Sequence, residues 1–386
     1  MTEIEFSILL NDLADIEHIQ PLLIEFEKRQ SIKVTLTPIL WREGWAKLAN
    51  MALYGQGPDV SEIGTTWISS FAAMNALRPF GPEEVAMLGG ANAFLPVLWR
   101  TGILPGDTQI WAIPWVAFTQ LLYYRKQPVE KAGLSDVAAA FADLNSFNQT
   151  LERFFAKGLQ PSLGLTAYHF PPVVHEAASW IWSNDGDFLD GEGKRVIFNE
   201  PRAIQGLHAL FSLGRFLVPP SSPPRAPVTQ VVEGDAIVGI DGPYYALQQQ
   251  RLPAAEQLGI TPVPGVPCIG GSSLIIWKHS RRSRAALELV KFLSHHVPQA
   301  IRLPARRRIL QVLAEQDAFY QLAWSSLERG LTFPTVRLWG AIEERLITEL
   351  VTVWTEVLAN PNADLDMILH RQLDPLARKL NLMLAG

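Results

Sequence analysis

Six of the twelve tryptophans stand at the ends of apolar runs, where loops begin: Trp41, Trp67, Trp111, Trp115, Trp180 and Trp182. An indole in such a place can present a flat apolar face, with polar groups of the same loop beside it. The C–H face of a sugar packs on such a ring, and its hydroxyls need oxygen acceptors such as those of Asp59, Asn184 and Asp185. The pattern therefore predicts a site for a polyhydroxylated solute, against the alternative that each ring is an ordinary core aromatic.

Size and composition narrow the class of protein. A chain of 386 residues exceeds the usual single core, so two domains are expected. With 48% hydrophobic and 18% charged residues the chain is typical of a well-buried globular protein. A net charge of −5 gives no general basic field, so nucleic acid is not an expected partner. Cys268 is the only cysteine, which excludes an intrachain disulfide and a thiolate metal site.

The N-terminal segment alternates strand and helix patterns. Apolar residues at every second position from Ile4 to Leu10 predict a strand that ends at Asn11 and Asp12. A helix over 16–28, a strand over 33–39, a helix over 44–54 and a strand over 60–63 follow. This alternation predicts a mainly parallel α/β sheet with ligands at the carboxyl ends of its strands. The loops at Asn11, at Trp41 and from Gly64 to Trp67 would lie at that edge.

The rest of the chain has a less regular pattern. Residues 111–124 predict an extended segment that leaves one lobe and enters the next. Helices are expected over 151–155, 180–184 and 285–293, and strands over 236–240 and 274–277. The last ~60 residues are expected to be helical, because apolar side chains recur every four residues from Leu338 to Trp354.

Several short motifs occur in a fixed order along nearly the whole chain. They are Gly57–Val60, Trp111–Trp115, Leu122–Arg125, Lys131–Leu134, Asn184–Asp190, Phe198–Pro201, Glu233–Ile237, Gly242–Tyr245, Gly270–Gly271 and Leu303–Arg307. In this order and spacing the chain closely resembles the carbohydrate-type extracellular solute-binding proteins of ABC importers. Each motif is short and tolerant, so their order carries the resemblance.

The resemblance implies a two-lobed α/β fold of the type II periplasmic-binding-protein class. Each lobe would be a mainly parallel sheet flanked by helices, with a ligand cleft between lobes that close on the solute. The expected division is 1–113 plus 276–324 for the first lobe and 114–275 plus 325–386 for the second. The resemblance also implies a carbohydrate ligand, the transmembrane subunits of an ABC importer as partner, a monomer, no cofactor, no metal and no catalysis.

Ligand-binding residues are carried over to the positions that match the family's sugar-contacting loops. From the first lobe come Asn11, Asp12, Trp41, Asp59, Thr65, Thr66 and Trp67. From the other lobe and the return crossing come Trp115, Phe118, Trp182, Asn184, Asp185, Tyr244, Tyr245, Gly271 and Ser272. The carboxylates of Asp59 and Asp185 would each accept hydroxyl hydrogen bonds, which are worth roughly 1.5–3 kcal/mol when water is excluded.

The chain departs from the family pattern in three places. Asp235 stands where a basic residue is common, and Arg125 replaces the usual Asn or Asp after a tyrosine pair; both bear on specificity and not on the fold. Met1 is followed almost at once by strand-like residues, which leaves no room for a secretory signal. The resemblance implies an extracytoplasmic location, whereas the missing signal leaves a cytoplasmic one open.

Three rival interpretations remain open. Asp185, Asp187, Asp190 and Glu192 could form a glycosidase pair, but they crowd a Gly-rich hairpin where solvated turn carboxylates are commoner. The pairs Tyr123–Tyr124 and Tyr244–Tyr245, with His169, His175, His295 and His296, could serve a ferric-ion binder of the same fold. The chain could also be a ligand sensor that is not coupled to transport.

Overall fold

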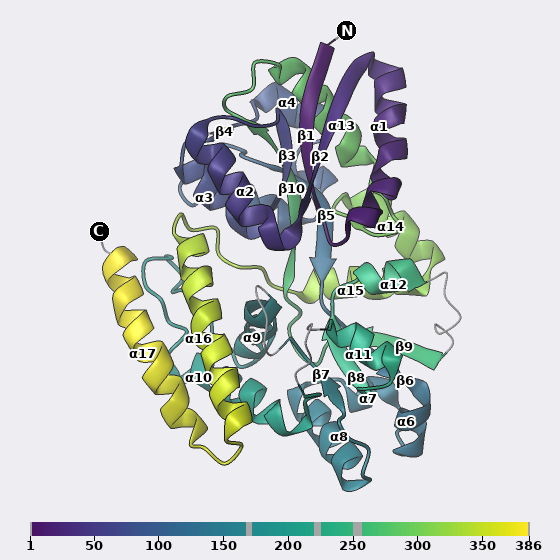
Figure 1. Ribbon diagram of the computed structural model, residues 1–386, viewed down its shortest axis with the longest axis vertical. Helices are drawn as coiled ribbons and strands as arrows, with labels where there is room; N and C mark the ends of the chain where they lie inside the picture. The colour runs from purple at the N-terminus through teal and green to yellow at the C-terminus, as the bar shows by residue number, and fades with distance from the viewer. Residues whose placement is uncertain (1, 167–171, 220–224, 250–256, 385–386) are drawn as a thin grey trace. The chain divides into compact units, whose positions relative to one another are not determined.

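The structure, a computed structural model, describes residues 2–166, 172–219, 225–249 and 257–384 (Figure 1). The chain forms two compact units that each draw on separated stretches of sequence. Unit 1 consists of Met1–Phe118, Ile269–Trp324 and Thr332–Gly340. Unit 2 consists of Thr119–Cys268, Ser325–Leu331 and Ala341–Gly386.

Unit 1 is built on a seven-stranded sheet whose path runs β11-β5-β10-β3-β1-β2, with β4 beside β10. Its strands are β1 (Thr2–Leu10), β2 (Ile32–Leu40), β3 (Val60–Gly64), β4 (Leu77–Arg78), β5 (Ile113–Thr119), β10 (Ile269–Trp277) and β11 (Leu303–Pro304). β1 is parallel to β2 and β3, and β10 is antiparallel to β3. The carboxyl ends of β1, β2 and β3 therefore meet at one edge, as the sequence predicts.

Helices cover both faces of this sheet (Figure 1). They are α1 (Ile16–Gln30), α2 (Trp41–Tyr54), α3 (Ile68–Ala73), α4 (Pro82–Met87), α5 (Pro96–Thr101), α13 (Ser283–His295) and α14 (Arg307–Gln316). The period of two along β1 explains the layering, because Ile4, Phe6, Ile8 and Leu10 pack toward α1 and α13 while Leu9 packs toward α2 and α3. The predicted strand–helix alternation is confirmed here.

Unit 2 contains a four-stranded sheet in the order β7-β8-β6-β9. The strands are β6 (Leu121–Arg125), β7 (Leu163–Gly164), β8 (Val238–Asp241) and β9 (Leu258–Pro262). β6 is antiparallel to β8 and β9, and β7 is parallel to β8. The prediction of a mainly parallel sheet is therefore wrong for this unit, because β6 enters it in the direction opposite to β8.

The helices of unit 2 are α6 (Lys126–Lys131), α7 (Val137–Ala140), α8 (Leu144–Ala156), α9 (Pro172–Ser183), α10 (Pro201–Phe211), α11 (Pro227–Glu233), α12 (Tyr244–Gln249) and α17 (Leu365–Leu384). α11 packs on this sheet, whereas α10 packs on α9 and α17 (Figure 1). α15 (Ala318–Arg329) and α16 (Trp339–Ala359) begin in unit 1 and continue into unit 2. The helical C-terminal region is thus confirmed. α9 and α10 lie close together at Gly206, where a Cβ atom would come within 2.5 Å of the Trp180 carbonyl.

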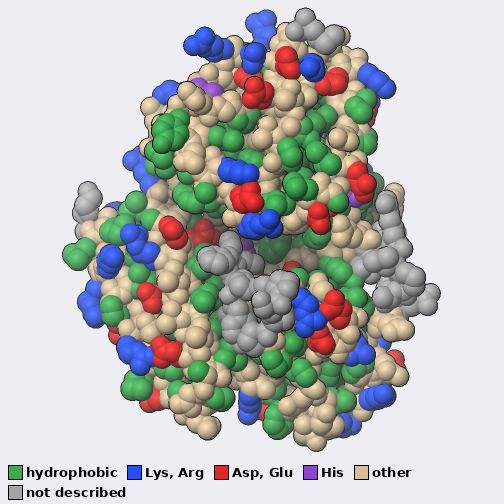
Figure 2. Space-filling model, viewed as in Figure 1, with side chains coloured by type: hydrophobic (Ala, Val, Ile, Leu, Met, Phe, Trp, Pro, Cys, Tyr) green, Lys and Arg blue, Asp and Glu red, His purple; other side chains and the backbone are tan. Residues whose placement is uncertain are grey.

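Charged side chains of both signs are mixed over the face shown in Figure 2. This mixture agrees with the small net charge of −5 and gives that face no continuous basic field. Among the described helices, none is both long and apolar enough to cross a bilayer.

Candidate functional site

The carboxyl edge of the unit 1 sheet brings most of the predicted first-lobe residues together. Asn11 and Asp12 follow β1, Trp41 follows β2, and Thr65, Thr66 and Trp67 form the 3-10 turn after β3. Gly271 and Ser272 arrive at the same edge, because the antiparallel strand β10 places Ser272 opposite Gly64. We call this set of loops the unit 1 edge.

Aromatic rings form a continuous group at the unit 1 edge. The ring centroids of Trp41 and Trp67 are 5.6 Å apart, and those of Trp45 and Trp67 are 5.9 Å apart. All three indoles are half-buried. Gly44 lets them approach, since a Cβ atom there would lie 2.8 Å from the Leu9 side chain and 3.0 Å from Trp67. Sequence reasoning missed Trp45, although it stands four residues after Trp41 and so shares its helical face.

Polar groups flank these rings. Asn11 and Asp12 are exposed, and Thr66 is half-buried. Asp12 caps the turn that follows β1, because its Oδ1 accepts the Ala14 N–H at 2.9 Å. This bond and the capping box that Asp12 forms with Asp15 fix the exposed carboxylate at the unit 1 edge.

Ser272 and Gly271 serve the interior of unit 1. The Ser272 hydroxyl donates to Glu62 Oε1 at 2.5 Å, and the residue is 1% exposed. Gly271 has φ +139°, and a Cβ atom there would lie 2.0 Å from the Val116 carbonyl oxygen. Both therefore support the packing of the strands.

Asp59 lies at the opposite edge of the sheet, since β3 begins only at Val60. Its carboxylate accepts the Glu5 N–H at 3.0 Å and the Ser280 hydroxyl at 2.7 Å, and it lies 3.4 Å from the Arg282 guanidinium. The prediction that Asp59 receives ligand hydroxyls conflicts with this placement, because the buried carboxylate is already occupied at the amino ends of the strands.

Trp115 was expected to contribute to the second lobe, but it lies inside unit 1 and is 1% exposed. Its ring packs edge-on against Phe6, with centroids 6.1 Å apart, and its Nε1 donates to the His296 carbonyl at 3.2 Å. The alternation of β5 turns Trp115 into the core. Phe118, at the other end of the same strand, is half-buried and remains a candidate.

The three predicted residues at the end of α9 have structural roles. Trp182 is 6% exposed, donates to Asp187 Oδ1 at 3.0 Å and packs against Phe188. Asn184 donates to the Trp180 carbonyl at 2.9 Å and closes the helix. Asp185 has φ +56° in the turn after it. Trp182 and Asn184 are therefore engaged within unit 2 itself, whereas Asp185 is an exposed turn carboxylate.

A polar cluster, of which the sequence predicts only Tyr244 and Tyr245, occupies the carboxyl ends of β7 and β8 in unit 2. Glu176, in α9, is 2% exposed, and its Oε1 accepts the Thr166 N–H at 2.7 Å. Its Oε2 is buried without a hydrogen-bond partner among the described residues. Burial, with a smaller contribution from Asp241, raises the pKa of Glu176 to about 8. The signal in the sequence was a lone glutamate in the apolar run of α9.

Asp241 and the tyrosine pair Tyr244–Tyr245 complete this cluster. The carboxyl group of Asp241 accepts the Gly242 N–H at 2.7 Å and the Val228 N–H at 3.3 Å, and its enclosure raises the pKa to about 6. Tyr244 accepts a hydrogen bond from Gln248 at 2.8 Å. The buried Tyr245 hydroxyl has no partner in the described part of the chain. Together with Glu176 and Asp241, these residues form what we call the unit 2 edge.

The pair Tyr123–Tyr124 is not placed to bind a ferric ion, because the Tyr123 hydroxyl is already bonded inside unit 2. Tyr123 is 1% exposed, its hydroxyl donates to the Gly242 carbonyl at 2.7 Å, and burial raises its pKa well above the ordinary value. Among the described residues no group of three His, Cys, Asp or Glu side chains is placed to hold a metal. His169, one of the histidines considered, lies outside the described residues.

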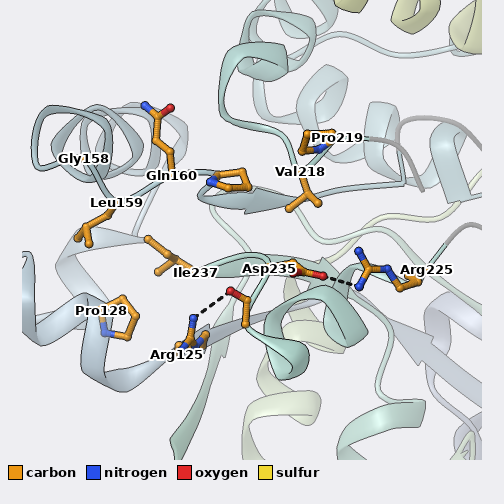
Figure 3. Close-up of a pocket in the computed structure, with 12 residues that line it drawn as sticks. Arg125, Pro128, Gly158, Leu159, Gln160, Val218, Pro219, Arg225, Asp235 and Ile237 are labelled. Atoms are coloured by element: carbon orange, nitrogen blue, oxygen red, sulfur yellow. Dashed lines mark hydrogen bonds and ion pairs between the residues drawn. The ribbon is translucent and has the colours of Figure 1, made fainter. Parts of the chain in front are cut away.

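A pocket of about 550 Å³ opens at the other edge of the unit 2 sheet (Figure 3). Arg125 and Asp235, the two positions that depart from the family pattern, both line it. Arg125 donates to the Gly234 carbonyl at 3.1 Å, and Asp235 pairs with Arg225. β6 is antiparallel to β8, and Asp241 pairs with Leu121 at the start of β6. Arg125 lies at the other end of β6, far from Asp241 along the strand. These departures therefore lie away from the unit 2 edge.

Comparison with known families matches residues 13–300 to the bacterial extracellular solute-binding proteins. The chain belongs to this family. The match covers most of the sequence, so the family predicted from the order of the motifs is confirmed.

Individual relatives agree with this assignment. A probable ABC transporter-binding protein of Deinococcus radiodurans is 25% identical over 223 residues, which are 53% of this chain and 51% of that protein. The chain thus matches about half the length of this curated relative.

Two solved structures share the fold over the full length. A solute-binding protein of an ABC transporter from Thermotoga lettingae, bound with α-D-tagatose, has a TM-score of 0.82 at 18% identity over all of both chains. The sugar-binding protein MalE of Xanthomonas citri has a TM-score of 0.81 at 23% identity over 100% of this chain and 98% of its own. The predicted type II periplasmic-binding fold is confirmed.

Proposed function

We propose that this protein is a non-catalytic binding protein that captures a neutral sugar or glycoside and delivers it to the membrane subunits of an ABC importer. The observation that carries the proposal is the group of half-buried indoles, Trp41, Trp45 and Trp67, beside the polar loops of the unit 1 edge. Indole faces pack on the C–H faces of sugar rings, while carboxylate, amide and hydroxyl groups bind their hydroxyls.

The unit 2 edge supports a neutral solute. With a pKa of about 8, Glu176 is mostly protonated at neutral pH, so its carboxyl group can both donate and accept a hydrogen bond without a net charge. The Thermotoga lettingae protein is bound with tagatose and the Xanthomonas citri protein is a sugar-binding protein, and both agree with the proposal. The proposed contacts are Asn11, Asp12, Trp41, Trp45, Thr65, Thr66, Trp67, Phe118, Tyr244, Tyr245 and Glu176.

A thermal-shift screen over a library of neutral mono- and oligosaccharides tests the proposal. A sugar at 100 times its Kd stabilises the native state by about 2.7 kcal/mol, which gives a measurable rise in melting temperature. Trp41→Ala is expected to abolish the shift. Trp111→Ala is the matched control, because Trp111 is a half-buried indole of the same unit that bonds Asp107 and precedes β5, at the end of that strand away from Phe118.

Two results would count against the proposal. If no sugar in the library raises the melting temperature, the proposal that the ligand is a carbohydrate is wrong. If a sugar raises the melting temperature of Trp41→Ala as much as that of Trp111→Ala, the binding site lies away from the unit 1 edge. Closure of two lobes on the solute, delivery to a permease, a monomeric state and an extracytoplasmic location stay predictions.

A further inference from the structure

The parallel pairing between β1 and β3 stops before either strand ends. β1 pairs with β2 along its whole length, to Leu10 opposite Leu40. Its pairing with β3 includes only Phe6 opposite Val60 and Ser7 opposite Ser61, although β3 continues to Gly64. The two strands therefore part just before the loops that form the unit 1 edge.

Two charged side chains fill the place of the missing backbone pairing. The Leu9 N–H donates to Glu62 Oε2 at 2.9 Å, and the Leu9 carbonyl accepts a hydrogen bond from the Arg302 guanidinium. Arg302 also donates to Glu62 Oε1 at 2.5 Å. The N–H and the carbonyl of Leu9 are thus bound by side chains instead of by the backbone of β3.

The same pair is tied to the neighbouring strands. Ser272 of β10 donates its hydroxyl to Glu62 Oε1, and the Arg302 guanidinium carbon lies 4.9 Å from the centroid of the Trp115 ring in β5. Glu62 is 1% exposed and Arg302 is 8% exposed. One buried ion pair therefore connects β1, β3, β10 and β5 at the ends that carry Asn11, Thr66 and Phe118.

Stability alone is a weak reason for this arrangement. Burying two charges costs desolvation energy that their attraction often only offsets, and apolar replacements of similar volume are often neutral or stabilising. A hydrogen-bonded ion pair does, however, admit one geometry, whereas apolar side chains slide over one another. The Glu62–Arg302 pair is suited to fixing a distance between strands.

We infer that Glu62 and Arg302 are positioning residues, which hold the ends of β1 and β3 at a fixed separation and so set the spacing of the ligand-binding loops. They act through Leu9 and do not touch the solute. The inference rests on the proposed function for the role of those loops. The positioning itself is a property of the free protein, and it is measured without a ligand.

Arg306 supplies a matched control. It is also 8% exposed in unit 1, and its guanidinium donates to the Ser294 and Leu88 carbonyls and lies 4.8 Å from the Phe94 centroid. It bonds no strand end of the unit 1 edge. Arg302→Met and Arg306→Met thus remove equivalent groups from two places in one unit.

Hydrogen–deuterium exchange of the unliganded protein is the deciding measurement. Arg302→Met is expected to speed exchange of the amides at 9–12 and 64–67 by at least about tenfold, whereas Arg306→Met speeds exchange near Leu88 and Phe94 and leaves the unit 1 edge unchanged. Equal acceleration of 9–12 and 64–67 in both variants would overturn the inference, since that pattern reports general destabilisation.

The double variant Glu62→Met/Arg302→Met separates positioning from stability. Its melting temperature is expected to recover toward that of the unsubstituted protein, because no buried charge is left unpaired. Exchange at 9–12 should nevertheless stay fast. Recovery of slow exchange together with stability would show that any well-packed pair suffices, and would refute the positioning role.

A binding measurement distinguishes this inference from the proposed function. With maltose as probe, Arg302→Met is expected to raise Kd at least about tenfold and Arg306→Met less than about threefold. If maltose does not bind the unsubstituted protein, the exchange result alone decides the inference, and only the proposed function is weakened. Maltose binding that is equal in both variants would refute the influence on the ligand loops.

Discussion

Unit 1 and unit 2 each bury a glutamate near the carboxyl ends of their strands, yet they satisfy it in different ways. Glu62 accepts hydrogen bonds from the Leu9 N–H, the Ser272 hydroxyl and the Arg302 guanidinium. Among the described residues Glu176 is hydrogen-bonded only by Thr166, and the neighbouring Asp241 adds a like charge. The comparison indicates that Glu62 forms a structural ion pair. Glu176 is instead a neutral polar group whose protonation changes with pH.

The same substitution in both units tests this difference most strongly. Glu62→Leu is expected to lower the free energy of unfolding by about 3–5 kcal/mol, because it leaves the buried Arg302 charge without its partner. Glu176→Leu should cost no more than about 1–2 kcal/mol, since it removes a protonated group that bonds only Thr166 among the described residues. Urea unfolding at pH 7 measures both. Equal losses would mean that the two carboxyl groups have equivalent environments.

The pH dependence of stability is the next largest effect. The pKa of Glu176 is about 8 in the folded protein, against an ordinary value of 4.5 in the unfolded chain. Between these values only the folded state holds the proton, so stability is highest at the acid end and falls as pH rises toward 8, by up to about 1.4 kcal/mol per pH unit.

Glu176→Gln should flatten this slope, because the amide cannot ionise. The measurement is urea unfolding in steps from pH 5 to pH 8, with Glu192→Gln on the exposed hairpin as control. A slope that is the same in Glu176→Gln and in the unsubstituted protein would assign the titration to another group.

Asp59 extends the comparison to a third buried carboxylate, at the amino ends of the unit 1 strands. Asp59→Ala leaves the Glu5 N–H and the Ser280 hydroxyl without their acceptor. We expect a loss of about 1–3 kcal/mol in unfolding free energy and no change in sugar affinity. Thermal unfolding and titration of the same sample measure the two quantities. A large loss of affinity at unchanged stability would return Asp59 to the ligand site.

The smallest expected effect comes from Asp241→Asn. Because the Asp241 charge contributes to the raised pKa of Glu176, its removal should lower that pKa. The Glu176 carboxyl signal in a ¹³C NMR titration would then move at lower pH than in the unsubstituted protein. A titration midpoint that stays in place or rises would show that Asp241 does not act on Glu176.

Local patterns were sufficient to predict the first half of unit 1. The period of two along β1 and the helical period of α1 are set by adjacent residues, so the order β1-α1-β2-α2-β3 and its carboxyl edge follow from them. Asn11, Trp41, Thr66 and Trp67 were therefore placed correctly at that edge.

The structure differs from the sequence expectation where the place of a residue depends on its packing in the folded chain. Asp59 precedes β3 while Thr65 follows it, so a shift of a few residues moves a side chain across the whole sheet. Which alternate residues of β5 face the core depends on packing against Phe6 and Arg302, and that packing buries Trp115. Glu176 lies in no recognisable motif, because its environment depends on burial, on Thr166 in the loop before α9 and on Asp241, which is distant in sequence.

The most direct test of the central claim is an NMR titration of the tryptophan indole N–H signals with a sugar that raises the melting temperature. The account predicts that the signals of Trp41 and Trp67 shift on binding, while those of the buried Trp115 and of Trp111, which precedes β5, stay in place. Saturation by the sugar with unchanged Trp41 and Trp67 signals would contradict it.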